Sequence, residues 1–219
     1  MRVNRYISMS TGVSRRRADQ LIAEGRAQVD SLPAKLGQVI NDGQKVYLDK
    51  QLLQLPEKLR VVILNKPIDY VVSRKGQGSK TIYDLLPAEM SHLKAIGRLD
   101  KDSSGLIVLT NDGQLAQSLG HPSSNKLKIY NIWLNKPLTP NHEQLISGNG
   151  IKLVDGLSHL NLKKIDKLGQ NYLVSMTEGR NRQIRRTFEA VGYKVTVLNR
   201  TQFGDYVLGD LGLGEYIEL

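Results

Sequence analysis

The stretch "AIGRLDKDSSGLIVLTNDG" (residues 95–113) decides how this chain is interpreted. Its second half contains the continuous apolar run "GLIVLT", which predicts a buried strand, and the "NDG" that follows predicts a turn. Its first half is a charged loop bracketed by Gly97 and Gly105, which permit a tight backbone. The loop carries two carboxylates, Asp100 and Asp102. They are either surface charges of an ordinary turn or groups that do chemistry, and the rest of the chain is needed to choose.

The composition favours a polyanionic partner. The chain has 219 residues, with 31 Lys and Arg against 21 Asp and Glu, a net charge of +10. Such a surplus favours nucleic acid first and an anionic membrane surface second. The absence of cysteine excludes disulfides, thiol catalysis and Cys-ligated metals, and the 4 scattered histidines lack metal-ligand spacing, so no metal site is expected. Neither a signal peptide nor an apolar run long enough to span a bilayer is recognisable, so a soluble cytoplasmic protein is expected.

Residues 1–50 are predicted to form a small domain of their own. Apolar residues at helical spacing predict a first helix, and Ser14 is a suitable N-cap for a second helix that stops at Gly25. Short strands with an Asn-Asp-Gly turn complete this unit. Residues 51–57 are then predicted to be a linker to a second domain, residues 58–219.

The small domain is basic. It contains nine Lys and Arg against five Asp and Glu, a net charge of +4. Three consecutive arginines, Arg15, Arg16 and Arg17, begin the second helix, where cations oppose the helix dipole. Residues that cost local stability suggest a functional reason, such as contact with phosphates. A solvated basic turn is the other interpretation.

The second domain is predicted to contain many strands with a few helices between them. The expected strands are residues 61–66, 70–73, 105–110, 126–134, 151–154, 158–164, 172–178, 195–200 and 214–219. The expected helices are a short one starting at Thr81, then residues 114–119, 140–148 and 179–193, the last capped by Asn181 and stopped by Gly192. Because strands and helices do not alternate strictly, an α+β fold around a mixed, largely antiparallel sheet is predicted.

The last helix combines an apolar stripe with arginines. Apolar residues from Ile184 to Val191 lie within one face of a helical wheel and define its buried side. Arg182 and Arg186 point to the opposite side, toward solvent or a polyanion. Arg185 lies at the border of the apolar stripe, where its rigid fork suits a partly buried carboxylate. A solvated face and a structural salt bridge are the alternatives for these arginines.

The strand "KLKIYNIWL" (residues 126–134) carries a tyrosine on an apolar face. Lys128 and Tyr130 share this face with Ile132 and Leu134. From this stretch alone, Tyr130 is either a core tyrosine or a platform on which a base stacks.

Five segments together resemble a known family. "NKPIDYVVS", "GRLDKDSSGLIVLTNDGQLAQSLGHP", "KIY", "GRNRQIRRTFEAVGY" and "LNRTQFG" resemble the bacterial ribosomal-RNA pseudouridine synthases of the Rsu/Rlu-B type, in the family's order and over essentially the whole chain. The basic N-terminal unit resembles the alpha-L RNA-binding module. The chain departs from the family at Asp69, where glycine is usual, and at Ser103, where threonine is usual. "VDSLPAK" also replaces the usual Asn-Gly turn of the alpha-L module.

The resemblance implies a role for each residue singled out above. Asp100 is implied as the catalytic aspartate, Tyr130 as the residue that packs against the target base, and Arg185 as the basic partner of the aspartate. The implied pocket lining is Arg98, Leu99, Lys128 and Leu198, and the expected RNA contacts are Arg5, Arg15, Arg16, Arg17, Arg182 and Arg186. Asp102 is assigned to the loop surface. Because the reaction rearranges uridine without gain or loss of atoms, no cofactor or metal is implied. The target base must leave its helix to enter the pocket.

These observations predict a cytoplasmic, monomeric ribosomal-RNA pseudouridine synthase. Its expected partner is ribosomal RNA or a pre-ribosomal particle, and no membrane partner is expected. The "GRNRQIRR" helix resembles the enzymes that act on large-subunit RNA, so large-subunit RNA is favoured. One alternative is a non-catalytic RNA-binding or ribosome-assembly protein on the same fold. A DNA-binding regulator is disfavoured, because the second helix offers few Asn or Gln side chains for base edges.

Overall fold

The computed structural model describes residues 1–56 and 58–219. Residue 57, the last residue of the predicted linker, lies outside the described residues. In chain order the elements are α1 (Val3–Thr11), α2 (Arg15–Ala23), β1 (Ala27–Val29), β2 (Leu32–Pro33), β3 (Val46–Leu48), β4 (Gln51–Leu52), β5 (Val61–Lys66), β6 (Lys94–Ile96), β7 (Ser104–Thr110), α3 (Gly113–Gly120), β8 (Lys128–Leu134), α4 (Pro140–Gln144), β9 (Ile151–Leu153), β10 (Gly156–Ser158), β11 (Asn161–Lys164), β12 (Asn171–Met176), α5 (Gln183–Glu189), β13 (Val195–Phe203), β14 (Tyr206–Val207) and β15 (Tyr216–Glu218). Short 3-10 helices span Ile82–Leu85, Ala88–Met90 and Pro122–Ser124, and a π-helical turn spans Leu145–Asn149.

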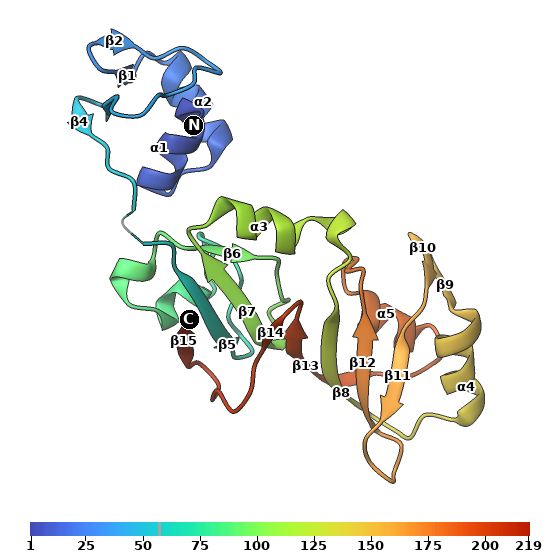
Figure 1. Ribbon diagram of the computed structural model, residues 1–219. Helices are drawn as coiled ribbons and strands as arrows, with labels where there is room; N and C mark the ends of the chain where they lie inside the picture. Colours follow the sequence, from blue (N-terminus) through green and yellow to red (C-terminus); the bar gives the residue numbers. More distant parts are fainter. Residues whose placement is uncertain (57) are drawn as a thin grey trace.

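The two N-terminal helices and strands β1 to β4 form a unit with its own small core (Figure 1). The strands are ordered β2-β1-β3-β4. Ser14 caps α2 as predicted, since its side chain accepts a hydrogen bond from the backbone N–H of Arg17 at 3.1 Å. One contact to the rest of the molecule comes from Lys94, whose Nζ donates to Ser8 Oγ at 3.1 Å and to the carbonyl of Val13 at 3.4 Å.

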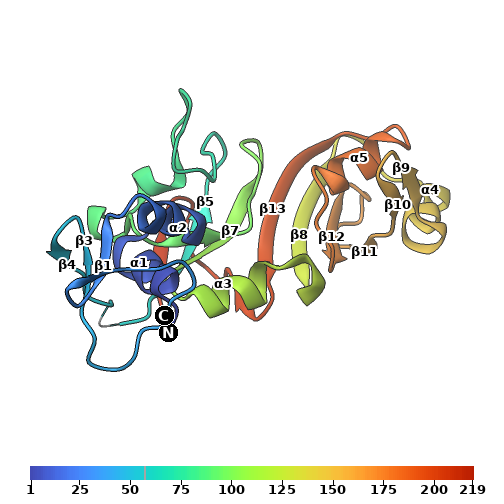
Figure 2. The same cartoon turned by 90° about the horizontal axis from the view of Figure 1, so that it is seen from above.

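The remainder of the chain is built on a nine-stranded mixed sheet. Its strands run in the order β11-β12-β8-β13-β7-β5-β15, with β14 added to β13 and β6 added to β7. Among the described residues the pairing in this sheet is antiparallel except between β13 and β7, where Asn199 lies opposite Ser104. Figure 2 shows β13 and β8 between the two ends of the sheet, with β5 and β7 on one side and β12, β11 and α5 on the other. The predicted α+β class with a largely antiparallel sheet is therefore confirmed.

The run Leu106–Leu109 in the middle of β7 is apolar at four consecutive positions because both of its faces are buried. The sheet is covered on both faces there, and the two faces belong to different hydrophobic clusters. Ile107 and Leu109 pack in the main cluster, whereas Leu106 and Val108 pack in a second cluster with Phe203. A strand buried on both faces loses the alternation of apolar and polar residues, so the continuous run marked this strand correctly. The loop that carries Asp100 leads directly into the N-terminal end of β7.

Several predicted elements differ from the structure. Residues 70–73 form no strand, because only Val71 makes a bridge, to Thr81. The predicted strand at residues 158–164 is broken near Leu160, which is buried: β10 pairs with β9, while β11 pairs with β12. Helix α5 starts later than predicted, at Gln183.

The helix start at α5 has a local cause. Arg182, and not Asn181, occupies the N-cap, with a left-handed backbone at φ 48°. The side chain of Gln183 accepts from the backbone N–H of Arg180 at 3.1 Å, and its own N–H donates to the Arg180 carbonyl at 3.2 Å, which closes a turn before the helix. Within residues 1–56 and 58–219, no helix has the length and apolar character needed to cross a membrane.

Candidate active site

The loop between β6 and β7 is fixed through its backbone. The N–H of Ser103 donates to the carbonyl of Asp100 at 3.1 Å and closes a turn. The next carbonyls also have donors: Lys101 O accepts from the N–H of Asp69 at 2.8 Å, and Asp102 O accepts from Arg185 Nη2 at 2.7 Å. A loop held at consecutive carbonyls presents its two aspartate side chains in a defined geometry.

A buried lysine lies beneath this loop. Lys66, at the end of β5, is fully buried, and its Nζ donates to Ser103 O at 2.7 Å and Pro67 O at 2.9 Å. Burial lowers the pKa of Lys66 to about 8, although the charges of Asp102 and Asp100 act in the opposite direction. Sequence analysis missed this residue, because a lysine at the end of a continuous apolar strand gives no sign of which side is covered.

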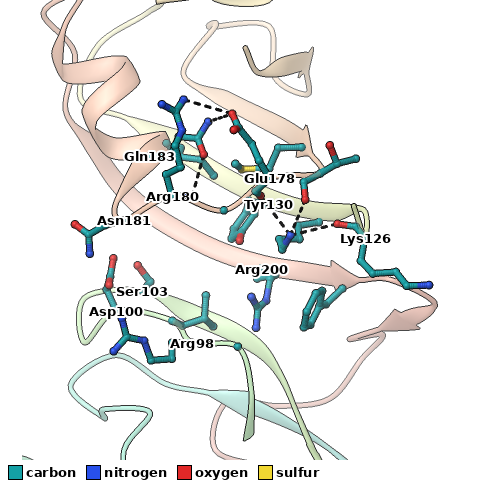
Figure 3. A pocket seen from close by; sticks show the side chains of 18 of the residues that line it. Arg98, Asp100, Ser103, Lys126, Tyr130, Glu178, Arg180, Asn181, Gln183 and Arg200 are labelled. Atoms are coloured by element: carbon teal, nitrogen blue, oxygen red, sulfur yellow. Dashed lines mark hydrogen bonds and ion pairs between the residues drawn. The ribbon is translucent and has the colours of Figure 1, made fainter. Parts of the chain in front are cut away.

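Asp100 stands at a cavity of about 600 Å³, a size typical of small-ligand sites. Figure 3 shows Arg98, Asp100 and Ser103 on one wall of the cavity, with Arg180 and Gln183 on the other. The predicted pocket residues Arg98, Leu99, Lys128 and Leu198 all line it, together with Tyr130.

Tyr130 lies both in the hydrophobic core and at the wall of the cavity. It is 8% exposed and belongs to the main hydrophobic cluster, and it also lines the cavity. Leu198 on the neighbouring strand β13 is buried to the same degree. The cavity therefore has a hydrophobic floor with an aromatic ring, and a carboxylate at its rim. This arrangement can hold a flat, partly apolar ring system of a ligand next to the carboxylate of Asp100.

The cations at the far end of the cavity are held by backbone carbonyls. Lys128 Nζ donates to Thr177 O at 2.8 Å and to Glu178 O at 3.3 Å. Burial lowers the pKa of Lys128, and the charge of Arg200 adds to this effect. Arg200, which sequence analysis also missed, is 2% exposed and donates through two nitrogens to Leu106 O. It ties β13 to β7 beside the cavity.

Arg185 contacts the loop that carries Asp100 through the backbone of Asp102. Its side chain is 13% exposed, as expected for a residue at the border of the core. It donates through Nη1 to Val195 O at 2.7 Å and through Nη2 to Asp102 O at 2.7 Å. Its Nε lies 3.3 Å from Asp102 Oδ2 without the alignment of a hydrogen bond. The guanidinium thus meets Asp102 and joins the loop to β13. The role of Arg185 as the basic partner of Asp100 stays a prediction.

Arg182 donates hydrogen bonds to both carboxylates of this loop. Its Nη2 donates to Asp102 Oδ2 at 2.9 Å, and its Nη1 is shared between Asp102 Oδ1 at 3.1 Å and Asp100 Oδ2 at 3.4 Å. The pKa of Asp102 is lowered, chiefly by the hydrogen bonds from Arg182. Asp102 is 48% exposed in its side chain, so it does lie at the loop surface, yet it is the more strongly bonded of the two aspartates.

The remaining expected RNA contacts differ in exposure and in ion pairing. Arg186 is paired with Asp155 at 2.7 Å and so does not point freely into solvent. In α2, Arg17 is paired with Glu24 at 3.0 Å, whereas Arg15 and Arg16 are exposed and form no ion pair within the described residues. Arg5 on α1 is half-buried.

Comparison with known proteins gives the class of this site. A family model described as RNA pseudouridylate synthase matches residues 60–190, which include the whole cavity except parts of β13. The chain belongs to the RNA pseudouridylate synthase family, whose members are isomerases. The family resemblance drawn from the sequence motifs is confirmed.

Individual relatives are similar over most of the chain. An RNA pseudouridine synthase of Aquifex aeolicus is 33% identical over 100% of this chain and 90% of its own length. A ribosomal large subunit pseudouridine synthase B of Xylella fastidiosa is 34% identical over 94% of the chain, which spans only 46% of that protein. A dual-specificity RNA pseudouridine synthase of Salmonella typhi is 33% identical over 100% of the chain and 75% of its own length. A crystal structure of a pseudouridylate synthase superimposes with a TM-score of 0.71 at 31% identity, covering 100% of this chain and 96% of that one.

Proposed function

We propose that this protein converts a specific uridine of ribosomal RNA to pseudouridine, with Asp100 as the catalytic carboxylate and Tyr130 as the residue that packs against the target base. The observation that carries the assignment is the cavity of about 600 Å³, which Asp100 and Tyr130 both line. A flipped nucleotide base needs a pocket with an apolar face and a reactive group at its edge. The cavity offers both.

The proposed chemistry uses groups that the cavity provides. The bond between ribose carbon 1′ and nitrogen 1 of the base breaks, the base turns, and a bond between carbon 1′ and carbon 5 forms. The proton on carbon 5 is lost and nitrogen 1 gains one, so atoms balance without a cofactor. The carboxylate of Asp100 attacks or stabilises the electron-poor centre formed in this process. We propose that the Tyr130 ring supports the freed base by stacking and that its hydroxyl assists proton removal from carbon 5.

The N-terminal unit, residues 1–50, is proposed to hold the RNA. Its support is the net charge of +4 and the exposure of Arg15 and Arg16. Contacts between Lys or Arg and phosphates supply affinity without sequence selectivity. Residues 58–219 are proposed as the catalytic domain, acting as a monomer on ribosomal RNA or a pre-ribosomal particle.

The large subunit is proposed as the source of the target uridine. This preference for the large subunit rests on the "GRNRQIRR" segment and on the name of the relative from Xylella fastidiosa, a ribosomal large subunit enzyme. A map of pseudouridine across both ribosomal RNAs, in cells with and without the protein, tests this directly. Loss of a single position in large-subunit RNA is expected. Loss of a position only in small-subunit RNA would reverse the assignment.

The catalytic assignment is tested by Asp100→Asn. The amide preserves the shape of the side chain but removes its negative charge and most of its nucleophilicity. We expect turnover to fall by at least about 10³-fold, with the fold unchanged by circular dichroism. The assay is tritium release from carbon 5 of uridine in transcripts of ribosomal RNA.

Asp210→Asn is the matched control. Asp210 is an exposed aspartate of the same domain, and its side chain forms no hydrogen bond or ion pair within the described part of the chain. It should behave as wild type. An Asp100→Asn protein that still releases tritium at the wild-type rate would remove the catalytic carboxylate from this proposal.

A further inference from the structure

One buried arginine of the cavity keeps a nitrogen without a partner. Arg200, on β13, is 2% exposed and lines the cavity. Its Nε and Nη2 donate to Leu106 O at 2.9 and 2.7 Å, and its Cζ lies 4.7 Å from the centre of the Phe203 ring. Across residues 1–56 and 58–219, its Nη1 has no hydrogen-bond acceptor and its charge has no carboxylate partner. Nη1 is therefore a donor that the fold leaves for a ligand.

The cavity as a whole holds more cations than carboxylates. Its two carboxylates, Asp100 and Glu178, are already paired, with Arg182 and Arg180 respectively, each at 3.4 Å. The Lys and Arg residues of its lining are Arg98, Lys126, Lys128, Arg180, Arg182 and Arg200. A buried guanidinium without a counter-charge is costly. An anionic or strongly polar oxygen that enters the cavity is therefore stabilised by Arg200.

Arg200 lies beside the surface on which the target base is proposed to rest. It is directly opposite Tyr130 in the pairing of β13 with β8, so both side chains leave the same face of the sheet, with Cβ atoms about 5 Å apart. Leu198, two residues earlier on β13, shares this face. Figure 3 shows Arg200 and Tyr130 on neighbouring strands, between Asp100 at one end of the cavity and Lys126 at the other. A base that stacks on Tyr130 has its edge near Nη1.

The reaction places negative charge on this base, whichever centre the carboxylate attacks. If it attacks the sugar, the electron pair of the bond between carbon 1′ and nitrogen 1 stays with the base, and the charge spreads to O2 and O4. If it attacks carbon 6 of the base, the charge reaches O4. A donor that is already in place, in a site shielded from water, stabilises such developing charge strongly.

The turn of the base suits a single fixed donor. To bring carbon 5 to the place of nitrogen 1, the ring rotates by half a turn about the axis through nitrogen 3 and carbon 6. This rotation exchanges the positions of O2 and O4. A donor fixed at one edge of the pocket therefore meets a carbonyl oxygen both before and after the turn.

We propose that Arg200 is a further catalytic residue, whose Nη1 donates a hydrogen bond to a carbonyl oxygen of the target base and stabilises the negative charge of the base during the reaction. This inference rests on the proposed function. Arg200 transfers no proton: the base takes the electron pair of the broken bond to nitrogen 1 and returns it in the new bond from carbon 5. Because the charge develops after binding, the contact acts on kcat more than on KM.

Arg200→Lys and Arg200→Met test the proposal, with Arg60→Lys and Arg60→Met as matched controls. Arg60 also joins two strands, through bonds to Glu218 at 2.8 and 2.6 Å, but it is not among the residues that line the cavity. We expect kcat to fall about 30-fold for Arg200→Lys and at least about 10²-fold for Arg200→Met, with KM for RNA within about threefold of wild type. Both Arg60 variants should keep a kcat within about twofold of wild type. Thermal unfolding of all four proteins measures the cost to stability.

Two kinetic outcomes would overturn the inference. The first is a folded Arg200→Met protein with a kcat within about twofold of wild type. The second is an equal loss of kcat in the Arg60 and Arg200 variants, because such a loss follows from stability and not from contact with the base. If Arg200→Met does not fold, Arg200→Lys decides by the same criteria, since its ammonium can still donate to Leu106 O. Either outcome can occur while Asp100→Asn is inactive, whereas an active Asp100→Asn protein contradicts the proposed function instead.

A structural test does not depend on turnover. In a crystal structure of the Asp100→Asn protein with a bound fragment of ribosomal RNA, Nη1 of Arg200 should lie within about 3.2 Å of O2 or O4 of the flipped base. A flipped base whose carbonyl oxygens both lie more than about 4 Å from Arg200 would overturn the inference, whatever the kinetics of the variants.

Discussion

Two helices of this protein, α2 and α5, have arginines at or next to their N-terminal ends, and the two groups of arginines differ in what surrounds them. In α2, Arg15 and Arg16 project from an exposed surface and form no ion pair in the described part of the chain. At the start of α5, Arg182 and Arg185 donate hydrogen bonds of 2.7 to 3.4 Å to the loop that carries Asp100. The sequences look alike, but one group is free to meet a polyanion and the other is already bonded.

The difference separates two uses of positive charge. An exposed guanidinium acts by its charge, so a lysine in the same place serves nearly as well, and salt weakens the effect. A guanidinium bonded to two separate segments acts by its geometry, which a lysine does not reproduce. Arg185 of α5 fixes the loop of Asp100 to β13, whereas the arginines of α2 are suited to phosphates. Substitution by lysine is therefore the sharpest way to test the distinction.

Arg185→Lys should have the largest effect of these substitutions. Arg185 reaches Val195 O through one nitrogen and Asp102 O through another, and a single ammonium cannot reach both acceptors in the same way. We expect kcat to fall about 10²-fold, which corresponds to about 3 kcal/mol in the barrier. Single-turnover tritium release at saturating RNA measures it, at low and at high salt. A loss that salt leaves unchanged supports the geometric role, and a rate equal to wild type would break the comparison.

The contacts of α5 also mark where sequence reasoning reached its limit. The helical wheel placed Ile184 and Phe188 in the core and Arg185 at its border, and the structure agrees: they are 5%, 0% and, in its side chain, 13% exposed. The same wheel placed Arg182 on the solvent side, but Arg182 precedes the helix and has a left-handed backbone. Helical periodicity does not apply to a residue outside the helix. Its partner Asp102 is also 80 residues away in the chain, a contact that only the fold creates.

The strands also show what the sequence could predict and what it could not. The sequence "GLIVLT" predicted β7 well, because burial on both faces leaves a continuous apolar run. The same pattern concealed Lys66 at the end of β5, since no periodicity indicates that a charged end group is covered by a loop 37 residues further along the chain. The motif order identified the family and the cavity residues. Which arginine meets which aspartate was decided by tertiary contacts.

Lys66 offers a second test, through the dependence of stability on pH. Lys66 is a fully buried cation beneath the loop that carries Asp100, and burial lowers its pKa from the usual 10.5 to about 8. Between these values the unfolded chain binds a proton that the folded protein has lost, so stability should rise with pH. Relative to Lys66→Met, which lacks this proton, the wild type should gain about 2 kcal/mol between pH 8 and pH 10.

Urea unfolding of the wild type and of Lys66→Met at several pH values measures the difference. Using the difference cancels the titration of tyrosines and other lysines that both proteins share. If the difference in free energy of unfolding between the two proteins stays constant from pH 7 to pH 10, Lys66 keeps an ordinary pKa. The loop would then leave the Lys66 ammonium accessible to water, despite the contact to Ser103 O at 2.7 Å.

The smallest expected effect belongs to the arginines of α2. If Arg15 and Arg16 each meet one phosphate, replacing both with glutamine should weaken RNA binding up to roughly tenfold at moderate salt. It should also lower the slope of log affinity against log salt by about 1.4 to 1.8. Replacing both with lysine should leave affinity and slope close to wild type, because only charge is required. In contrast to Arg185→Lys, kcat at saturating RNA should be unchanged in both double variants.

Filter binding over a range of salt concentrations, with the same ribosomal RNA fragment used for turnover, measures these slopes. Ser14 caps the helix through the backbone N–H of Arg17, so substitutions at Arg15 and Arg16 leave this cap and the Arg17–Glu24 pair intact. Loss of local structure is therefore a poor explanation for a reduced slope. If the glutamine variant binds with an unchanged slope, the exposed arginines of α2 are a solvated basic turn after all, and the RNA must be held by other parts of the molecule. If the lysine variant loses as much affinity as the glutamine variant, these arginines also act by geometry, and the two clusters are more alike than their surroundings indicate.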